Sequence, residues 1–218
     1  MEQQDYVVDL SFLLRGTSIP ADHGYALYSA ISRHLPWLHG DRSVGVHPVQ
    51  GRLIGQRQLA LNELSRLVLR LPASKIPEAI CLAGKRLDLE GALLMVGVPT
   101  VQSLLPHSSL RSRLVIIKGF TEPTPFLEAV LRQLDQLGVN SSVALVPHRR
   151  GLSVEAQIGS RETVVRRTLR IRDKEVVGFA VQAVGLGPQD SLALQATGLG
   201  GRRRFGCGIF LPTPDVAE

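Results

Sequence analysis

Histidines near the start of the chain are the residues best suited to acid–base chemistry at neutral pH. Of the six in the sequence, four fall within positions 23–47. His39, in "LPWLHGDRS", directly follows a predicted helix, so a loop can aim its ring into a groove, and it is the first candidate. His47, in "VGVHPVQG", lies on a predicted strand and is the second candidate. His23 and His34 lie at the start and near the end of the helix, where capping, packing or the helix dipole explains them equally well.

Two tyrosines lie on the same predicted helix as these histidines. Tyr25 and Tyr28 can orient a catalytic base or position a phosphate, although either can equally belong to the core or its rim. The sequence therefore offers a cluster of polar and titratable groups around one helix, without deciding which of them share a site.

Other catalytic motifs are missing from the sequence. The glycine-rich segment near the C-terminus leads through arginines into a strand, which excludes a Walker loop and a dinucleotide fingerprint. There is no HExxH motif and no paired cysteine motif, so we expect neither a metal nor a cofactor. Cys81 and Cys207 are far apart, and both are expected to be small buried hydrophobes in a reducing compartment.

Positive charge is concentrated in two segments of the second half. The net charge is +6 and the sequence pI is near 9.9, which favours an acidic partner, with nucleic acid as the first suspect. The segment "RETVVRRTLRIRDK" partly alternates, so a strand would carry a basic stripe on one face. The segment "GLGGRRRFG" combines glycines, whose backbone N–H groups can approach a phosphate, with three arginines. The candidate RNA-binding residues are Arg166, Arg167, Arg170, Arg172, Lys174, Gly198, Gly200, Gly201, Arg202, Arg203 and Arg204.

Simpler explanations exist for both segments, namely a solvated edge hairpin and an ordinary glycine turn. Their presence in the same half of the chain favours a track for a phosphate backbone. Aromatic residues make up only 5% of the chain, which argues against a single-strand binder that stacks many bases. Recognition of the shape and phosphates of a duplex or hairpin fits this composition better.

The order of predicted elements repeats once along the chain. A strand, helix, strand, strand, helix and strand run from "YVVDLSFLLRG" to "GALLMVGVP", and the plan begins again at "SRLVIIKGFTEPTPFLEAVLRQLDQLG". In both halves the first strand ends in a basic residue and a glycine, Arg15-Gly16 and Lys118-Gly119. Two such βαββαβ units predict an α+β protein of tandem ferredoxin-like domains, with helices on one side of each sheet and the other side open to a partner.

We expect the domains to span residues 1–100 and 111–218, with the aperiodic residues 101–110 as the linker. The second domain is expected to include a strand at "LSVEAQI", residues 152–158. The start of the chain lacks the features of a signal peptide, and no stretch is long and apolar enough to cross a bilayer. We therefore expect a cytoplasmic protein with no membrane partner.

Within this plan, the segments "IPADHGYALYSAI…LPWLHG" and "GLGGRRRFGCGIF" resemble the CRISPR repeat-processing endoribonucleases, the Cas-six family of the RAMP superfamily, and in particular the short variety of myxobacterial-type type I systems. The likeness covers nearly the whole chain. It implies a metal-independent endoribonuclease that cuts CRISPR precursor RNA within each repeat, beside a short hairpin, to give mature crRNA. Attack by a 2′-OH would leave a 2′,3′-cyclic phosphate. The resemblance also implies other Cas subunits of a type I effector complex as partners.

The resemblance assigns roles to particular residues. The family's catalytic histidine falls on His39, and a tyrosine that some members use falls near Tyr28 or Tyr25. Some members have a catalytic lysine shortly after the histidine. This chain has none there, and Arg42 can stabilise charge but cannot act as a general acid at neutral pH. The catalytic candidates are therefore His39, Tyr28 and His47, and the family's glycine loop falls on Gly198, Gly200, Gly201, Gly206 and Gly208.

The main alternative function is a non-catalytic RAMP-fold subunit that binds crRNA inside an effector complex. A general RNA-binding module of paired ferredoxin-like domains is a second alternative, against which the scarcity of aromatic residues argues. A small-molecule enzyme for anionic substrates is a third, and it would not need charge spread over two separate segments. In the favoured interpretation, the basic second half holds the RNA and the histidine-rich first half cuts it.

Overall fold

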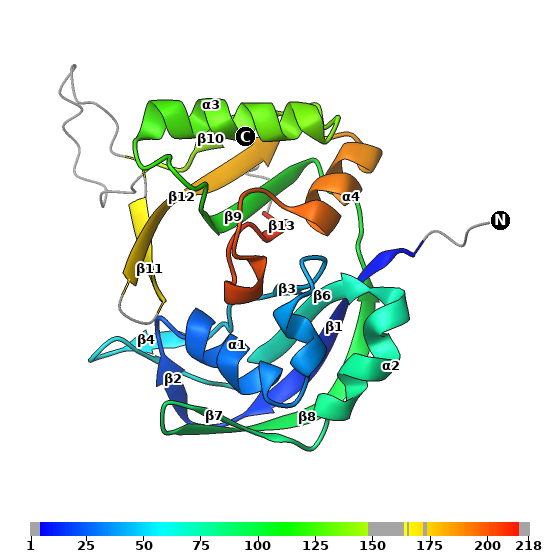
Figure 1. Ribbon diagram of the computed structural model, residues 1–218, viewed down its shortest axis with the longest axis vertical. Coiled ribbons are helices and arrows are strands. Elements are labelled where there is room, and N and C mark those ends of the chain that lie inside the picture. Colours follow the sequence, from blue (N-terminus) through cyan, green and yellow to red (C-terminus); the bar gives the residue numbers. More distant parts are fainter. Residues whose placement is uncertain (1–4, 148–163, 165, 172–173, 214–218) are drawn as a thin grey trace.

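The computed structural model describes residues 5–147, 164, 166–171 and 174–213. The N-terminal half, in the lower part of Figure 1, contains β1 (Val7–Arg15), α1 (Gly24–Ser32), β3 (Gly45–Val46), β6 (Arg66–Pro72), α2 (Ile76–Ala79), β7 (Arg86–Leu89) and β8 (Ala92–Ser103). The C-terminal half contains β9 (Ser109–Val115), α3 (Pro123–Gln136), β10 (Ser142–Leu145), β11 (Arg166–Ile171), β12 (Lys174–Val184), α4 (Pro188–Thr197) and β13 (Phe210–Pro212). The 3-10 helices are η1 (Pro36–His39), η2 (Ala73–Lys75), η3 (Ile80–Leu82) and η4 (Arg203–Phe205).

The two main sheets are antiparallel and share one strand order. The N-terminal sheet runs β3-β6-β1-β8-β7, and the C-terminal sheet runs β10-β12-β9-β13, with β11 also paired to β12. We number the four strands of each βαββαβ unit by their order in the chain. In both sheets they then lie side by side in the order second, third, first and fourth: β3, β6, β1 and β8 in the N-terminal sheet, and β10, β12, β9 and β13 in the C-terminal sheet. The predicted tandem ferredoxin-like fold of the α+β class is therefore confirmed.

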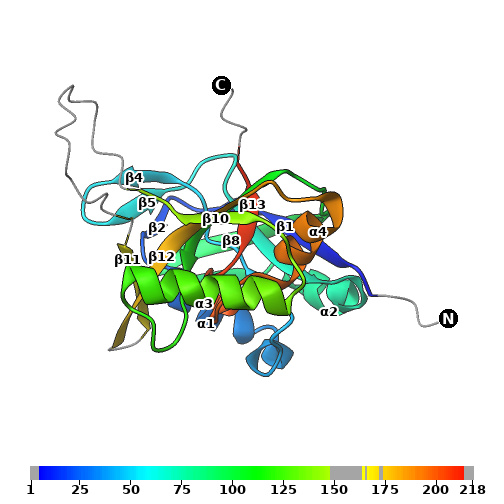
Figure 2. The same cartoon turned by 90° about the horizontal axis from the view of Figure 1, so that it is seen from above.

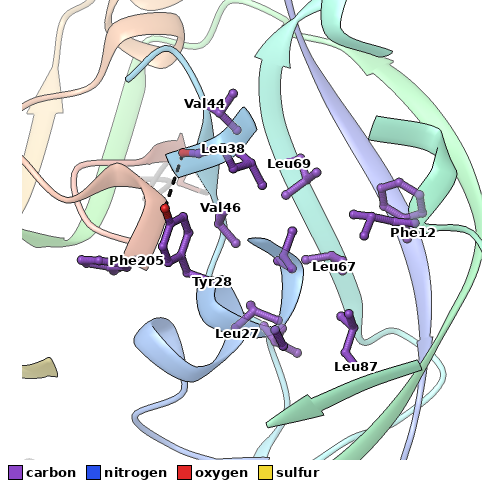
Figure 3. Close-up of a cluster of buried hydrophobic side chains, with 14 of the residues drawn as sticks. Phe12, Leu27, Tyr28, Leu38, Val44, Val46, Leu67, Leu69, Leu87 and Phe205 are labelled. Carbon is purple, nitrogen blue, oxygen red and sulfur yellow. Dashed lines mark hydrogen bonds between the residues drawn. The ribbon is translucent and has the colours of Figure 1, made fainter. Parts of the chain in front are cut away.

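Each half buries apolar side chains between its sheet and its helices. β1 buries its apolar side chains at alternate positions from Val8 to Leu14, and α1 packs Leu27 into the same cluster, as Figure 3 shows for Phe12 and Leu27. Ile31, one helical turn further along α1, belongs to the same cluster. In the C-terminal half, Phe126, Val130 and Leu134 of α3 recur at a spacing of four and enter a second cluster. The two cores follow the strand and helix periods of the sequence.

Three local features differ from the sequence-based expectation. The expected strand "SVGVHPVQG" is reduced to β3, because Pro48 has no N–H with which to continue the ladder. A third sheet, of β2 (Ser18–Pro20), β5 (Gln58–Ala60) and β4 (Arg52–Ile54), was not anticipated. Figure 2 shows its β4–β5 hairpin on the side of the molecule opposite α1 and α3. Cys81 is exposed, so the prediction that both cysteines are buried was wrong for this residue, whereas Cys207 is buried.

The two halves are connected by residues 104–108, because β8 runs to Ser103 and β9 begins at Ser109. Both sheets thus reach into the segment expected to be a linker. The strand expected at 152–158 lies outside the described residues. Within the described ranges, no helix combines the length and the apolar character that crossing a bilayer requires.

A buried arginine joins the two halves. Arg70, on β6, is 1% exposed, and its Nε and Nη2 each donate a hydrogen bond of 2.8 Å to a carboxylate oxygen of Asp9 on β1. Its Nη1 donates to the backbone oxygens of Gln195 and Phe210 in the C-terminal half, at 3.0 and 2.9 Å. A buried charge is tolerated when it is paired and its remaining donors are satisfied, so Arg70 fixes the C-terminal half on the N-terminal sheet.

Residues 198–208, termed the glycine loop below, use glycines chiefly to pack against the protein's own backbone. Gly198 and Gly208 have φ angles of +67° and +66°, and a Cβ on them would strike the backbone oxygens of Gly208 and Leu199 respectively. Gly200, with a φ of +70°, faces the backbone oxygen of Ile116 in the same way. Gly201 has open space around it. Of the three glycines expected to approach RNA, Gly198 and Gly200 therefore pack against the protein's own backbone, and Gly200 also lines a cavity described below.

Replacing Gly198 with alanine is expected to lower the free energy of unfolding by about 1–3 kcal/mol, because its backbone, with φ of +67° and ψ of −171°, lies in a region that is essentially restricted to glycine. The contact with Gly208 adds to this cost. Gly201→Ala is the matched control, because a Cβ there meets nothing within 4 Å. Urea unfolding of both variants measures the difference. Equal stabilities would contradict this account of the loop.

Candidate active site

A tyrosine and a histidine meet where α1 faces the short helix η1. Tyr28 Oη lies 3.1 Å from His39 Nδ1, and the two rings meet edge to face with centroids 5.7 Å apart. Tyr28 is only 6% exposed, and its hydroxyl also reaches the backbone oxygen of Leu38 at 3.5 Å (Figure 3). His39 itself is exposed. The buried Tyr28 thus contacts Nδ1 of His39 through its hydroxyl, while His39 itself is exposed to solvent.

The glycine loop completes this cluster through η4. The Phe205 ring packs edge to face on Tyr28, with centroids 5.1 Å apart. The Arg204 guanidinium lies 5.3 Å from the centroid of the Tyr28 ring and 5.1 Å from that of Phe205, and its Nη1 donates to the backbone oxygen of His39 at 3.2 Å. A Cβ on Gly24 would collide with the backbone oxygen of Phe205, so the glycine that begins α1 permits this approach.

His39 lines two cavities that share Arg202 and Arg204. The arginine cavity, of about 560 Å³, is lined by four arginines and one acid, together with glycines that include Gly200; the charged residues are Asp41, Arg42, Arg202, Arg203 and Arg204. The aromatic cavity, of about 780 Å³, is lined by Tyr25, Tyr28, Ser29, Ser32, Lys174 and Phe205, among others. The exposed His39 therefore borders one cavity that is rich in arginine and a second cavity that is lined by aromatic rings and serine hydroxyls.

The three consecutive arginines of the loop occupy different surroundings. Arg202 is exposed, and Arg204 lies over the rings described above. Arg203 is partly buried, and its Nε and Nη2 have no hydrogen-bond partner within the described part of the chain. Burial and the neighbouring Arg70 lower the pKa of Arg203 to about 10, with Asp9 acting in the opposite direction. Arg203 thus remains a cation at neutral pH in the wall of the arginine cavity.

The structure does not bring His47 or His23 to this cluster. His47 is buried, with Nε2 3.3 Å from Asp9 Oδ1, and it lines a separate cavity of about 500 Å³. Both ring nitrogens of His23 are engaged, Nδ1 with the backbone oxygen of Pro20 and Nε2 with the backbone N–H of Val49, each at 2.9 Å. Burial lowers the pKa of both histidines. His39 and Tyr28 are the sequence candidates that the fold places together.

The predicted basic stripe lies on β11, at the edge of this site. Arg166 and Arg170 are exposed, whereas Arg167 is half-buried on the opposite face of the strand, as the alternation predicted. The backbone N–H of Arg170 donates to Asp22 Oδ2 at 2.9 Å, which ties β11 to the start of α1. Lys174 begins β12 and lines the aromatic cavity. Arg172 lies outside the described residues.

Sequence reasoning missed several groups that line the site. Ser29 and Ser32 lie four and seven positions after Tyr25 on α1, so their helical spacing was a signal that they share a face. The contact of Arg204 with His39 joins residues 165 positions apart and had no such signal. Across the described residues, no group of three or more His, Cys, Asp or Glu side chains is arranged to hold a metal ion.

Comparison with known proteins identifies the family. The family model "Cas6 Crispr" matches residues 8–215. The CRISPR-associated endonuclease Cas6 of Myxococcus xanthus (strain DK1622) is 37% identical over 211 residues, which cover 97% of this chain and 84% of that protein.

Solved structures agree on the fold. A CRISPR-associated protein Cas6 superposes with a TM-score of 0.67 at 12% identity, covering 95% of this chain and 100% of the other. A Cas6-related protein from Pyrococcus furiosus gives a TM-score of 0.64 at 12% identity, covering 96% of this chain and 99% of the other. Together with the match to the family model, these relationships show that the chain belongs to the Cas6 family of CRISPR-associated endonucleases.

Proposed function

We propose that this chain cuts CRISPR precursor RNA within its repeats, with His39 as a group that moves a proton at the scissile phosphate. The relative from M. xanthus is named a CRISPR-associated endonuclease, and 37% identity across nearly the whole chain supports a shared activity. The observation that carries the site assignment is the contact of the buried Tyr28 with His39, which is exposed and lines both the arginine cavity and the aromatic cavity.

In this proposal the RNA supplies its own nucleophile. The 2′-OH of the nucleotide before the cut attacks phosphorus, so the O2′–P bond forms as the P–O5′ bond breaks. The products are a 2′,3′-cyclic phosphate and a 5′-hydroxyl. One proton leaves the 2′-OH and one joins the leaving O5′. Tyr28 engages Nδ1 of His39, so Nε2 performs one of these transfers. The proposed route needs no metal ion.

Negative charge grows on the phosphoryl oxygens as the pentacoordinate phosphorane forms. Arg42, Arg202 and Arg204 line the arginine cavity beside His39. Guanidinium groups held in place before the reaction stabilise such charge without reorganising. Arg42 cannot donate a proton at neutral pH, so its proposed role is electrostatic.

The RNA is held, in this proposal, by the basic edge of the C-terminal half. Arg166 and Arg170 lie on the exposed face of β11, and Lys174 lines the aromatic cavity. Such a row suits the phosphate backbone of a repeat hairpin whose cut site lies at His39. Affinity for the repeat is then expected to fall as the salt concentration rises.

The test is cleavage of a labelled repeat RNA in excess EDTA. Wild-type protein is expected to cut once and to leave a 2′,3′-cyclic phosphate that mass spectrometry detects on the upstream fragment. A repeat with a single 2′-deoxynucleotide immediately before the cut is expected to bind and remain intact. Cleavage of that deoxy repeat, or a requirement for added Mg²⁺, would overturn the mechanism.

Tyr28→Phe is expected to slow single-turnover cleavage by about 10-fold, the effect of losing one hydrogen bond to the reacting group. Little change in KM is expected, because the hydroxyl is buried and holds His39 rather than RNA. The pH–rate profile should also shift, a change that a loss of stability alone does not produce. Tyr6→Phe, at an exposed position, is the control. Wild-type rate and profile in Tyr28→Phe would contradict the positioning role.

A further inference from the structure

The proposed reaction restricts where one nucleobase can lie. The attacking 2′-OH and the base sit on neighbouring carbons of the same ribose, C2′ and C1′. When the scissile phosphate lies at His39, the enclosed spaces nearest to that base are therefore the ones that border His39. The structure offers two such spaces, the arginine cavity and the aromatic cavity.

The two cavities differ in the chemistry they offer. Arg202 and Arg204 line both cavities, and the arginine cavity adds Arg42, Arg203 and the open backbone of Gly201, a lining that suits the charged phosphate. The aromatic cavity presents Tyr25 and Phe205, whose rings meet edge to face with centroids 5.8 Å apart. Aromatic rings and short hydroxyl side chains are the groups with which proteins hold unpaired RNA bases. With the phosphate in the first cavity, the base falls in the second.

One face of α1 forms a wall of the aromatic cavity. Tyr25 and Ser29 are one turn apart and half-buried, and both line this space. Ser32, a further turn along, is buried and donates to the backbone oxygen of Ser29 at 3.2 Å, so its own hydroxyl is held. Lys174 contributes to the lining from the β11–β12 hairpin of the C-terminal half. The cavity thus combines a ring, a serine hydroxyl and an ammonium donor from different parts of the chain.

We infer that the aromatic cavity binds the unpaired base of the nucleotide immediately upstream of the cut, with Tyr25 as its stacking partner and Ser29 as a hydrogen-bonding group at its edge. The inference rests on the proposed function and adds to it a specificity subsite. A base held by a ring and a hydroxyl cannot be paired within the hairpin, so the cut falls beside the stem and not inside it.

The direct test removes the base and keeps the nucleophile. A repeat RNA with an abasic ribose, still carrying its 2′-OH, at the position before the cut is expected to show a kcat/KM roughly 10- to 100-fold below that of the natural repeat, the effect of one lost stacking interaction. The same abasic change at another unpaired position is the matched RNA control. Equal cleavage of the natural repeat and the repeat abasic before the cut would overturn the subsite.

Protein variants test whether Tyr25 and Ser29 are the residues that hold the base. Tyr25→Leu is expected to remove most of the difference between natural and abasic repeats, whereas Tyr25→Phe keeps the ring and should preserve the difference. Ser29→Ala is expected to change the order in which the four bases at that position are cleaved. If Tyr25→Leu slows both repeats equally, Tyr25 supports the fold and the inference is wrong.

The controls separate this inference from the proposed function. Wild-type protein must cut the natural repeat and spare the 2′-deoxy repeat for the proposed function to stand. If that holds and the abasic repeat is cut normally, only the base subsite fails. If wild-type protein cuts the 2′-deoxy repeat, the proposed mechanism fails and the subsite fails with it.

Discussion

His39→Ala is expected to slow single-turnover cleavage of the repeat by roughly 10²- to 10⁴-fold, the usual contribution of one general acid or base. The variant removes the ring nitrogen that meets the 2′-OH or the leaving oxygen, while the arginines on β11 and in the glycine loop stay in place. Binding of the repeat, measured by an electrophoretic shift, is therefore expected to stay close to wild type. Loss of cutting with retained binding is the combination that identifies a proton-transfer group.

Two matched variants make this result specific. His34→Ala removes a half-buried histidine of the same segment, whose Nε2 lies 3.3 Å from the backbone oxygen of Arg86, and it is expected to cut normally. His47→Ala tests the second sequence candidate, which lies beside Asp9 and away from both cavities at His39. If His39→Ala cuts as fast as wild type, the assignment of the site fails. If it is inactive and also fails to bind, the residue serves RNA binding instead.

Arg70→Met is expected to lower the free energy of unfolding by about 3–5 kcal/mol, the typical cost of removing one partner from a buried ion pair. The change leaves the carboxylate of Asp9 without its two hydrogen bonds and strips the backbone oxygens of Gln195 and Phe210 of a donor. Urea unfolding measures the loss. Arg66→Met is the control on the same strand, because the hydrogen bonds of Arg66 within the described residues go to the nearby backbone oxygens of Glu63 and Ser65.

The double variant Asp9→Asn with Arg70→Met tests the cause. Neutralising Asp9 removes the uncompensated buried charge, so the double variant is expected to be more stable than Arg70→Met alone. If the double variant is instead less stable than wild type by the sum of the losses in the two single variants, the unpaired charge of Asp9 does not explain the loss of stability in Arg70→Met.

The same ion pair predicts how stability depends on pH. Burial alone raises the pKa of Asp9, but the hydrogen bond from Arg70 and the neighbouring His47 outweigh it and hold that pKa well below its usual range. The carboxylate therefore stabilises the fold above its unfolded pKa of about 4, and this contribution is lost as pH falls from there toward the lower folded value. Arg70→Met should weaken the dependence in that window. An unchanged dependence would show that other carboxylates cause it.

Local sequence patterns were enough to predict the architecture. Strand and helix periods in the two halves predicted the duplicated βαββαβ plan, which the shared strand order confirms. The alternation of residues 166–171 predicted which arginines of β11 are exposed. The position of His39 after a predicted helix suggested that its ring can be aimed into a groove, and in the structure His39 lines two cavities. Each of these features depends on neighbours a few positions away.

Tertiary packing decided the composition of the site. Arg70 meets carbonyl oxygens 125 and 140 positions away, and Arg204 meets His39 across 165 positions, so no period within a segment reveals either contact. The low aromatic content argued against base stacking, yet folding gathers Tyr25, Tyr28 and Phe205 around one cavity. The glycines of the loop suggested access for RNA, and only the structure shows that Gly198 and Gly200 also pack against backbone oxygens of the protein. The physical reason is that periodicity specifies which face of an element is buried, whereas the groups that meet at a site depend on how the two halves pack together.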